Sequence, residues 1–229
     1  MTIHYHGTPI TPRSVLYTLA GRHFCVSFAS PQDVRVCHEI GQSVMLDNGA
    51  FSVWKTGKSV DWTVYYAWTD EWLAYQSTWA VIPDVIDAGS EAQDALMAQW
   101  PHGERGAPVW HTDEPIDRLC RLADDWPRVC IGSSGQHDPG SAAWHRVMDA
   151  AMNRLCAGRS PTWLHMLRGM NLADSGYPFA SVDSTDIARN HNRGIPARRM
   201  ADRWDALQAP GLWAGRAEQV EFWEASHGR

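Results

Sequence analysis

The sequence predicts an α/β fold of parallel strands, and a compact (β/α)8 barrel of the TIM type fits it best. Strand and helix patterns alternate about seven times along 229 residues, as they do when helices cross over between parallel strands. Three of the strand patterns end in an aspartate. The eighth strand is faint, so we place it near Leu212–Ala214 and expect it to be irregular or missing. No linker or repeat divides the chain, and we expect one barrel domain over residues 1–229.

The first predicted strand is His23–Ala29, whose apolar character suits a buried position. Pro31 then opens a helix that runs to about Ile40, because proline is tolerated in the first turn. A longer helix is predicted over Asp61–Gln76, with the Asp61 carboxylate as its cap. Its apolar face, which we expect to pack on the sheet, consists of Trp62, Tyr65, Tyr66, Trp72 and Leu73.

The rest of the chain continues the alternation of short apolar runs and helical stretches. Ser90 stands at one predicted helix start, and Thr112 or Asp113 at another, where short polar side chains cap helices. The other predicted strands are 44–47, 79–85, 108–111, 128–131, 162–167 and the strand that ends at 183. The other predicted helices are 90–100, 112–124, 141–155, 196–207 and 217–225.

Composition limits the classes of function. The formal net charge of -6 argues against a protein coated with nucleic acid but leaves room for local basic patches. The five cysteines form no CxxC pair, so we expect neither disulfides nor a structural zinc site. His4 and His6 alternate but have no further ligand nearby, and we expect no metal and no cofactor.

The chain shows no signal-peptide pattern and no long apolar run, so we expect a cytoplasmic protein with no membrane partner. Its thirteen tryptophans are unusually many. They are expected mainly to fill the core, although one or two could stack on a flat ligand. Whether a Trp-rich surface pairs two copies as a homodimer stays open.

The three strand-end aspartates, Asp47, Asp84 and Asp183, are the first candidates for chemistry. Side chains at the carboxyl ends of parallel strands meet around one mouth, so we expect these carboxylates to converge. Each aspartate could instead cap the following helix. Paired carboxylates suit glycosidic-bond chemistry, in which one attacks the anomeric carbon and another moves a proton.

Other strand ends carry further candidates. Gly132 and Ser133 open a Gly-Ser-Ser-Gly turn whose backbone N–H groups could hold a ligand carbonyl or an anion, or which could be a simple tight loop. His111 and His165 are candidates for substrate contact or for ordinary core positions. Arg189 and Arg193 begin an arginine-rich stretch that is either a solvated helix face or a phosphate-binding patch.

Taken in order, these strand ends resemble the tRNA-guanine transglycosylase superfamily, and most closely its short phage-borne relatives that are thought to modify DNA with 7-deazaguanines. The resemblance covers roughly residues 44 to 190. The matching stretches are Leu46-Asp47-Asn48-Gly49-Ala50-Phe51, Gly132-Ser133-Ser134-Gly135, Leu167-Arg168-Gly169-Met170, and Val182-Asp183-Ser184-Thr185 with Ala188-Arg189-Asn190.

The resemblance implies a (β/α)8 barrel that exchanges guanine for a deazaguanine through a covalent sugar–enzyme intermediate. Asp183 would then be the nucleophile and Asp47 the general acid/base. The base would be bound by Asp84, His111, Gly132, Ser133 and Phe51, with Asn48, His165 and Arg168 as further candidate substrate contacts.

The partners implied by the resemblance are a nucleic acid and free guanine or 7-deazaguanine. DNA is favoured over tRNA, because the family's zinc site of three closely spaced cysteines and a histidine is absent from this sequence. Two alternatives stay open. One is a hydrolase of nucleoside or nucleotide N-glycosides, and the other is a non-catalytic module that binds nucleobases or nucleic acid.

Overall fold

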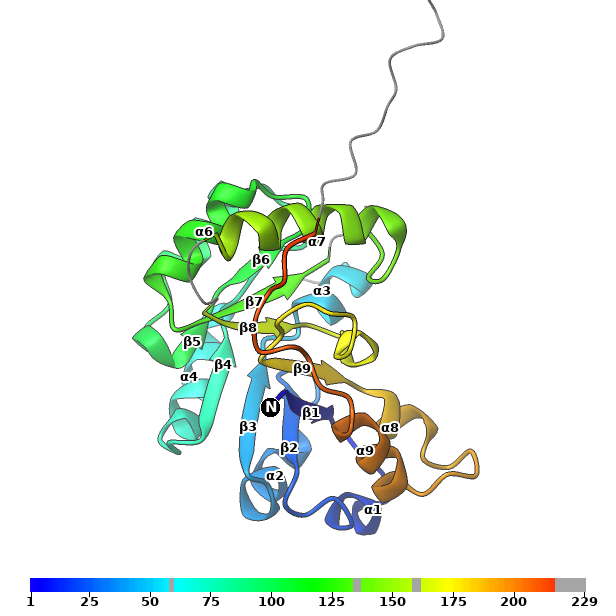
Figure 1. The fold of residues 1–229 in the computed structure, drawn as a ribbon. Helices are drawn as coiled ribbons and strands as arrows, with labels where there is room; N and C mark the ends of the chain where they lie inside the picture. Colours follow the sequence, from blue (N-terminus) through cyan, green and yellow to red (C-terminus); the bar gives the residue numbers. More distant parts are fainter. Residues whose placement is uncertain (58–59, 134–136, 158–161, 217–229) are drawn as a thin grey trace, which may run out of the picture.

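The computed structural model describes residues 1–57, 60–133, 137–157 and 162–216. The nine strands of the described residues lie in one parallel sheet, which curls into a nearly closed barrel surrounded by helices (Figure 1). The sheet order is β5-β4-β3-β2-β1-β9-β8-β7-β6. The strands are β1 (Ile3–Gly7), β2 (His23–Ser27), β3 (Ser43–Asp47), β4 (Thr78–Val81), β5 (Gly106–Ala107), β6 (Val109–His111), β7 (Arg128–Gly132), β8 (Trp163–Met166) and β9 (Ser181–Ser184).

The seam of the barrel lies between β5 and β6, the two ends of the sheet order. Only Pro108 separates these strands along the chain, so they occupy one barrel position between them. β5 pairs with β4 on one side, and β6 pairs with β7 on the other. Proline has no N–H to donate to a ladder, but its carbonyl oxygen accepts from Cys130 N at 2.8 Å. The predicted TIM-like barrel is therefore confirmed, with a proline-broken strand at its seam.

The strand that the sequence signalled only faintly is β1, near the N-terminus. β1 lies between β2 and β9 and pairs with both. The prediction that placed this strand near Leu212–Ala214 is wrong, because those residues form no strand. They follow the outside of the barrel, where the Trp213 indole donates to the Asn153 side chain at 2.8 Å.

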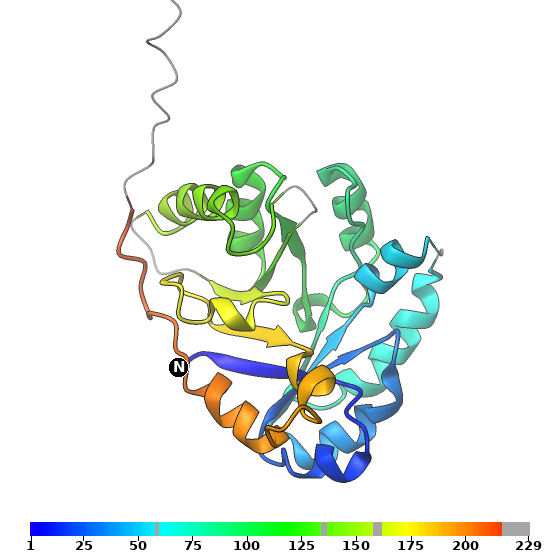
Figure 2. The same ribbon diagram turned by 90° about the vertical axis from the view of Figure 1, so that its right-hand side faces the viewer.

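The helices cover the outside of the sheet (Figure 2). The predicted cap of α4 is confirmed, because the Asp61 side chain accepts from Thr63 N. The other two predicted helix starts are wrong. Gly89 rather than Ser90 is the cap of α5, and α6 begins at Ile116 rather than at Thr112 or Asp113. The predicted helix 217–225 lies outside the described residues. The helices are α1 (Arg13–Tyr17), α2 (Val34–Ile40), α3 (Ala50–Thr56), α4 (Trp62–Leu73), α5 (Ser90–Ala98), α6 (Ile116–Asp125), α7 (Ala142–Leu155), α8 (Asp186–Asn190) and α9 (Ala197–Asp205), with short 3-10 turns at Pro31–Asp33, Gly103–Arg105 and Met170–Leu172.

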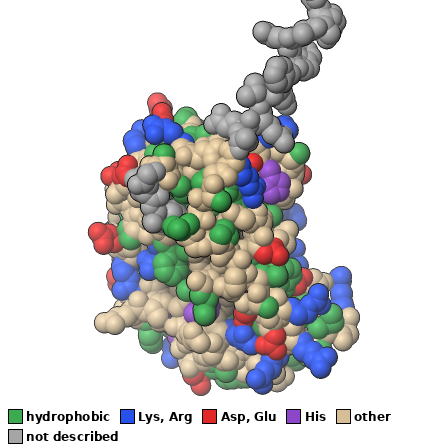
Figure 3. Space-filling model, viewed as in Figure 1, with side chains coloured by type: hydrophobic (Ala, Val, Ile, Leu, Met, Phe, Trp, Pro, Cys, Tyr) green, Lys and Arg blue, Asp and Glu red, His purple; other side chains and the backbone are tan. Residues whose placement is uncertain are grey.

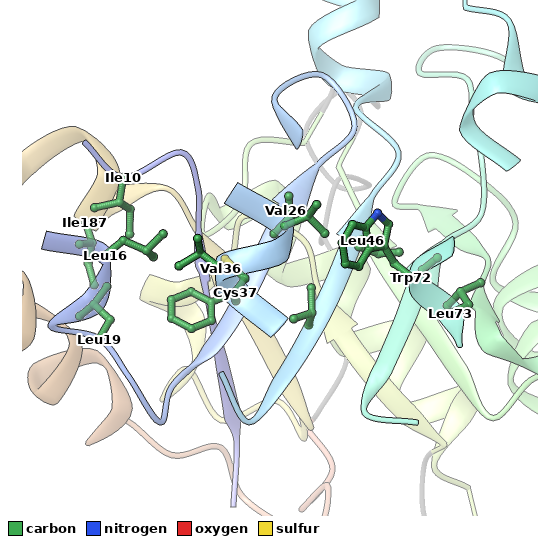
Figure 4. Packing of buried hydrophobic residues seen from close by; sticks show 14 of the residues in the cluster. Ile10, Leu16, Leu19, Val26, Val36, Cys37, Leu46, Trp72, Leu73 and Ile187 are labelled. Carbon is green, nitrogen blue, oxygen red and sulfur yellow. The ribbon is translucent and has the colours of Figure 1, made fainter. Parts of the chain in front are cut away.

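Alternate residues of the strands point to opposite faces of the sheet and contribute to two different hydrophobic cores. One core lies between the sheet and the helices, where Val26 and Leu46 pack towards Trp72 of α4 (Figure 4). Tyr65, Trp72 and Leu73 of the predicted aromatic face are buried there, which confirms its packing role. The other set fills the barrel interior with Tyr5, Cys25, Met45, Trp79, Val81, Ala107, Val109 and Cys130. No helix of the described residues is both long and apolar enough to cross a membrane.

Candidate functional site

Strand periodicity aims the candidate residues at the barrel axis. Asp47 lies two residues after interior Met45, and His111 two residues after interior Val109, so both face the same way as those residues. Asp183 is paired in register with interior Tyr5. Together with Asp84, which follows β4, they line one cavity of about 550 Å³ at the carboxyl ends of the strands. The predicted convergence of the three aspartates is thus present in the structure.

Asp84 is bonded through both of its oxygens. Asn48 Nδ2 donates to Oδ1 at 2.8 Å, and His111 Nε2 lies 2.9 Å from Oδ2. Asn48 is itself fixed, because it also donates to the Ile82 carbonyl and accepts from Ala50 N. Burial alone would lower the pKa of His111, but the bond to the Asp84 carboxylate and its charge outweigh burial, and the pKa is raised. The two side chains therefore form a buried hydrogen-bonded pair that lines the cavity.

A buried ion pair between Glu114 and Arg118 holds the backbone of His111 in place. Glu114 Oε2 accepts from the backbone N of His111 at 2.8 Å and from Arg118 Nη1 at 3.0 Å. Arg118 also donates to Asp94 and to the Val109 carbonyl. Sequence reasoning missed these residues. The i,i+4 spacing of Glu114 and Arg118 was the available signal, although such pairs are usually exposed.

Asp183 is held through one oxygen only. Its Oδ1 accepts from Arg168 N at 2.6 Å and lies 3.3 Å from His165 Nε2. Oδ2 makes no hydrogen bond to the described residues, and the side chain lines the cavity. Arg168 presents its N–H from a left-handed conformation with φ of 54°, which is rare for a residue with a side chain. The arrangement positions the carboxylate and leaves Oδ2 open to a substrate.

His165 lies beneath Asp183 and is fully buried, and it does not line the cavity. An ionised Asp183 can only accept, so the imidazole proton belongs on Nε2. Nδ1 of the ring lies 2.8 Å from the Ser181 hydroxyl, whose oxygen accepts the Trp163 indole N–H at 2.8 Å. This chain of hydrogen bonds orients the ring of His165. The residue therefore supports Asp183 and does not reach the space open to a substrate.

The environment of Asp47 changes its ionisation. Burial raises its pKa to about 6, and the charges of Asp183 and Asp84 act in the same direction. A hydrogen bond from Ser27 and the N–H of Gly49 oppose the rise. A carboxyl group that titrates near pH 6 can both give and take a proton under neutral conditions.

Helix α3 forms part of the cavity wall. The sequence predicted no helix between the strand that ends at Asp47 and the helix at Asp61. Gly49 takes φ of 77° and caps the start of α3. Its exposed Phe51 lies under the Arg168 guanidinium, whose carbon is 4.1 Å from the ring centroid. The flat ring and the guanidinium plane border the cavity together, and such a pair suits a flat ligand.

The remaining candidates divide between the cavity and its surroundings. Gly132 and Ser133 line the cavity, and a Cβ on Gly132 would stand 2.8 Å from Nδ1 of His111. Ser134 and Gly135 of the same turn lie outside the described residues. Arg189 lines the cavity, whereas Arg193 lies exposed on the loop after α8. Among the described residues, no group of three or more His, Cys, Asp or Glu side chains could hold a metal ion.

No protein-family model, no curated protein and no solved structure matches this chain.

Proposed function

We propose that the protein is a guanine transglycosylase, which exchanges a guanine of nucleic acid for a 7-deazaguanine through a covalent aspartyl–sugar intermediate. The observation that carries the proposal is the meeting of Asp47 and Asp183 in one cavity, where burial raises the pKa of Asp47 to about 6. Two carboxylates in unlike environments can divide nucleophilic and proton-transfer roles between them. The order of the strand-end motifs supports the same assignment.

In the first half-reaction, Oδ2 of Asp183 attacks C1′ of the target nucleoside. The bond from C1′ to guanine breaks, its electron pair leaves with the base, and the Asp47 carboxyl group supplies the proton that the base takes up. The open Oδ2 and the fixed Oδ1 suit this role, because a nucleophile must be positioned without being fully bonded to the protein.

In the second half-reaction, the incoming base gives its proton to Asp47 and attacks C1′ from the side that the first base left. The bond from C1′ to Asp183 breaks, and the carboxylate is restored. Two displacements at one carbon retain the configuration of the sugar. Neither half-reaction needs a cofactor.

The Asp84 side of the cavity suits recognition of the base. Guanine presents N–H donors along its pairing edge, and a carboxylate accepts several hydrogen bonds at once. Asn48 and His111 hold Asp84 in one orientation, so the acceptor is arranged before the base arrives. The stacked pair of Phe51 and the Arg168 guanidinium would border the base on one side, and the backbone near Gly132 and Ser133 would meet its carbonyl oxygen.

DNA is the polymer we favour, since the sequence lacks the closely spaced cysteines and histidine of the tRNA enzymes. A guanosine within a duplex would have to leave the base stack to reach the cavity. The same carboxylates would also serve an N-glycoside hydrolase, in which water replaces the incoming base. The experiment therefore has to separate exchange from hydrolysis.

The test is a base-exchange assay with radiolabelled guanine and, separately, duplex DNA, single-stranded DNA, tRNA and free guanosine. We expect label to enter DNA, and Asp183→Ala to prevent its entry. Release of guanine without incorporation of label would replace the proposal with the hydrolase. Neither incorporation nor release, combined with tight binding of guanine, would favour the non-catalytic binding module.

A further inference from the structure

A strip of arginines leads away from the cavity along α8, the loop after it and α9. We call these residues the α8–α9 strip, and all of them are exposed. Lys and Arg side chains gather over this region on the face shown in Figure 3, which has the view of Figure 1. Residues 189–203 hold five arginines and a single acidic residue, in a chain whose formal net charge is -6. The strip consists of Arg189, Arg193, Arg198, Arg199 and Arg203.

The acidic residues beside the strip are occupied by other partners. Asp202 and Asp205 form ion pairs with Arg22, which precedes β2. Asp186 accepts hydrogen bonds from the Trp204 indole and the Asn190 amide. Among the described residues, none of these three aspartates forms an ion pair with an arginine of the strip.

The arginines themselves have no such partners within the described part of the chain, where no ion pair involves any member of the strip. Arg199 and Arg203 are also one helical turn apart on α9, where like charges repel and destabilise a helix. A row of unpaired guanidinium groups that costs the helix stability is a feature suited to an anionic partner outside the chain.

The strip begins at the candidate site. Arg189 lines the cavity. It lies on α8, which follows directly after β9, the strand that carries Asp183. Two hollows flank its outer part. One, of about 570 Å³, is lined by Tyr17, His191 and Arg198 among others. The other, of about 480 Å³, is lined by Ile195, Arg203 and Trp204 among others.

We propose that the α8–α9 strip binds the phosphate backbone of the nucleic-acid strand whose target nucleoside enters the cavity. This inference rests on the proposed function and specifies where its polymer lies. Guanidinium groups hold phosphate oxygens through two parallel hydrogen bonds. The exposed ring of Tyr17, 45% accessible, adds a surface on which a base can stack. Continuity with the cavity favours a nucleic acid over an acidic protein or a lipid surface.

The test compares two triple variants that change net charge equally. Arg193→Gln/Arg199→Gln/Arg203→Gln removes three strip charges and spares Arg189, which belongs to the cavity. The control, Arg121→Gln/Arg146→Gln/Arg154→Gln, removes three exposed charges from α6 and α7. Binding of a fluorescent mixed-sequence 20-mer, single-stranded and duplex, is measured from low to moderate salt, together with phosphatidylserine vesicles.

We expect the strip variant to bind the oligonucleotides at least about 10-fold more weakly at low salt. Its plot of log affinity against log salt should be shallower by about 2 to 3, since each lost phosphate contact removes somewhat less than one from the slope. The control should bind as the wild type does. Equal weakening of both variants would overturn the proposal, because net charge alone would explain it.

Two further results would also overturn it: undiminished oligonucleotide binding by the strip variant, or binding of the wild type to vesicles but not to oligonucleotides. The exchange assay on the same preparations keeps the two proposals apart. Strip-dependent binding without exchange would count against the transglycosylase alone. Exchange into DNA that the strip variant carries out at the wild-type rate would count against the strip alone.

Discussion

On the β4–β6 side of the cavity, both oxygens of Asp84 are bonded to side chains, and the His111 that holds one of them is itself held by Glu114. On the β3–β9 side, Asp183 accepts hydrogen bonds through one oxygen, and the Asp47 carboxyl group accepts from Gly49 N and is bonded to Ser27. On the first side, donors from other residues hold each carboxylate in one orientation. On the second, Oδ2 of Asp183 makes no hydrogen bond to the described residues.

This difference matches two tasks. A recognition group works best when its position is fixed before the ligand arrives, whereas a reacting group must still be able to form a bond or exchange a proton. Changes on the β3–β9 side should therefore reduce the rate of the chemical step. Changes on the β4–β6 side should weaken substrate binding.

The largest effect is expected from Asp183→Ala. Loss of the proposed nucleophile should reduce exchange by about 10,000-fold or more, as removal of a nucleophile does in other covalent enzymes. Melting temperature should be measured in parallel, because the Arg168 N–H loses its acceptor. Asp70→Ala, which removes an exposed carboxylate from α4, is the control. Turnover near the wild-type rate in a folded Asp183→Ala protein would exclude the covalent mechanism.

Asp47→Asn should reduce exchange by about 100- to 10,000-fold, the usual range for a general acid/base. In the wild type, kcat should depend on pH with an apparent pKa near 6, the value to which burial raises Asp47. The variant should retain its residual rate without that dependence. An unchanged pH profile in the variant would remove Asp47 from the proton-transfer role.

The same substitution should stabilise the fold, and the sign follows from the direction of the shift. Because the folded state raises the pKa of Asp47, it binds the proton more tightly than the unfolded chain, and stability is lost as pH rises from about 4 to 6. Asn cannot ionise, so the variant should exceed the wild type by about 2 to 3 kcal/mol at pH 7. Chemical denaturation at pH 4 and pH 7 checks this: the gain should disappear at pH 4, and equal gains at both would contradict the assigned pKa.

How far the sequence predicts this fold depends on local pattern. The predicted strands that end at Asp47 and Asp183 are short apolar stretches, as is typical of buried strands in a parallel sheet. This pattern was enough to place them. β1 could not be found in this way, because His4 and His6 look polar although both are buried. The residue that makes burial of His6 possible lies far along the chain: Oδ1 of Asp205, on α9, is 3.2 Å from Nε2 of His6.

The candidate site was predictable in a similar, partial way. Parallel topology alone implied that the aspartates meet at one end of the barrel. The partners that distinguish them were not predictable, because they come from other strands: His111 for Asp84, and His165 with Ser181 for Asp183. The pKa of Asp47 depends on the same tertiary arrangement and has no local signal.

A smaller effect, and on the other side of the cavity, is expected from Gly132→Ala. The added Cβ would stand 2.8 Å from Nδ1 of His111 and 3.0 Å from Val109, so the imidazole must move and its bond to Asp84 must lengthen. KM for guanine should rise by about 10-fold with little change in kcat, as expected when a binding contact rather than a reacting group is lost. Gly211→Ala, where a Cβ meets nothing within 4 Å, is the control. A fall in kcat alone would contradict the division between the two sides.

The smallest effect should come from Ser181→Ala, which tests the chain of hydrogen bonds behind Asp183. Removing the hydroxyl leaves the Trp163 indole and His165 Nδ1 without their partner, which should cost about 1 to 3 kcal/mol of stability. The matched control is Ser43→Ala, because Ser43 makes the same kind of bridge between His23 and Tyr5 but has no contact with Asp183. Both variants should lose similar stability. Only Ser181→Ala should lower kcat, by about 3- to 10-fold, and alter its pH dependence, because only there does the freed imidazole touch the nucleophile. Equal kinetic effects of the two substitutions would mean that the interior hydrogen bonds act on stability alone.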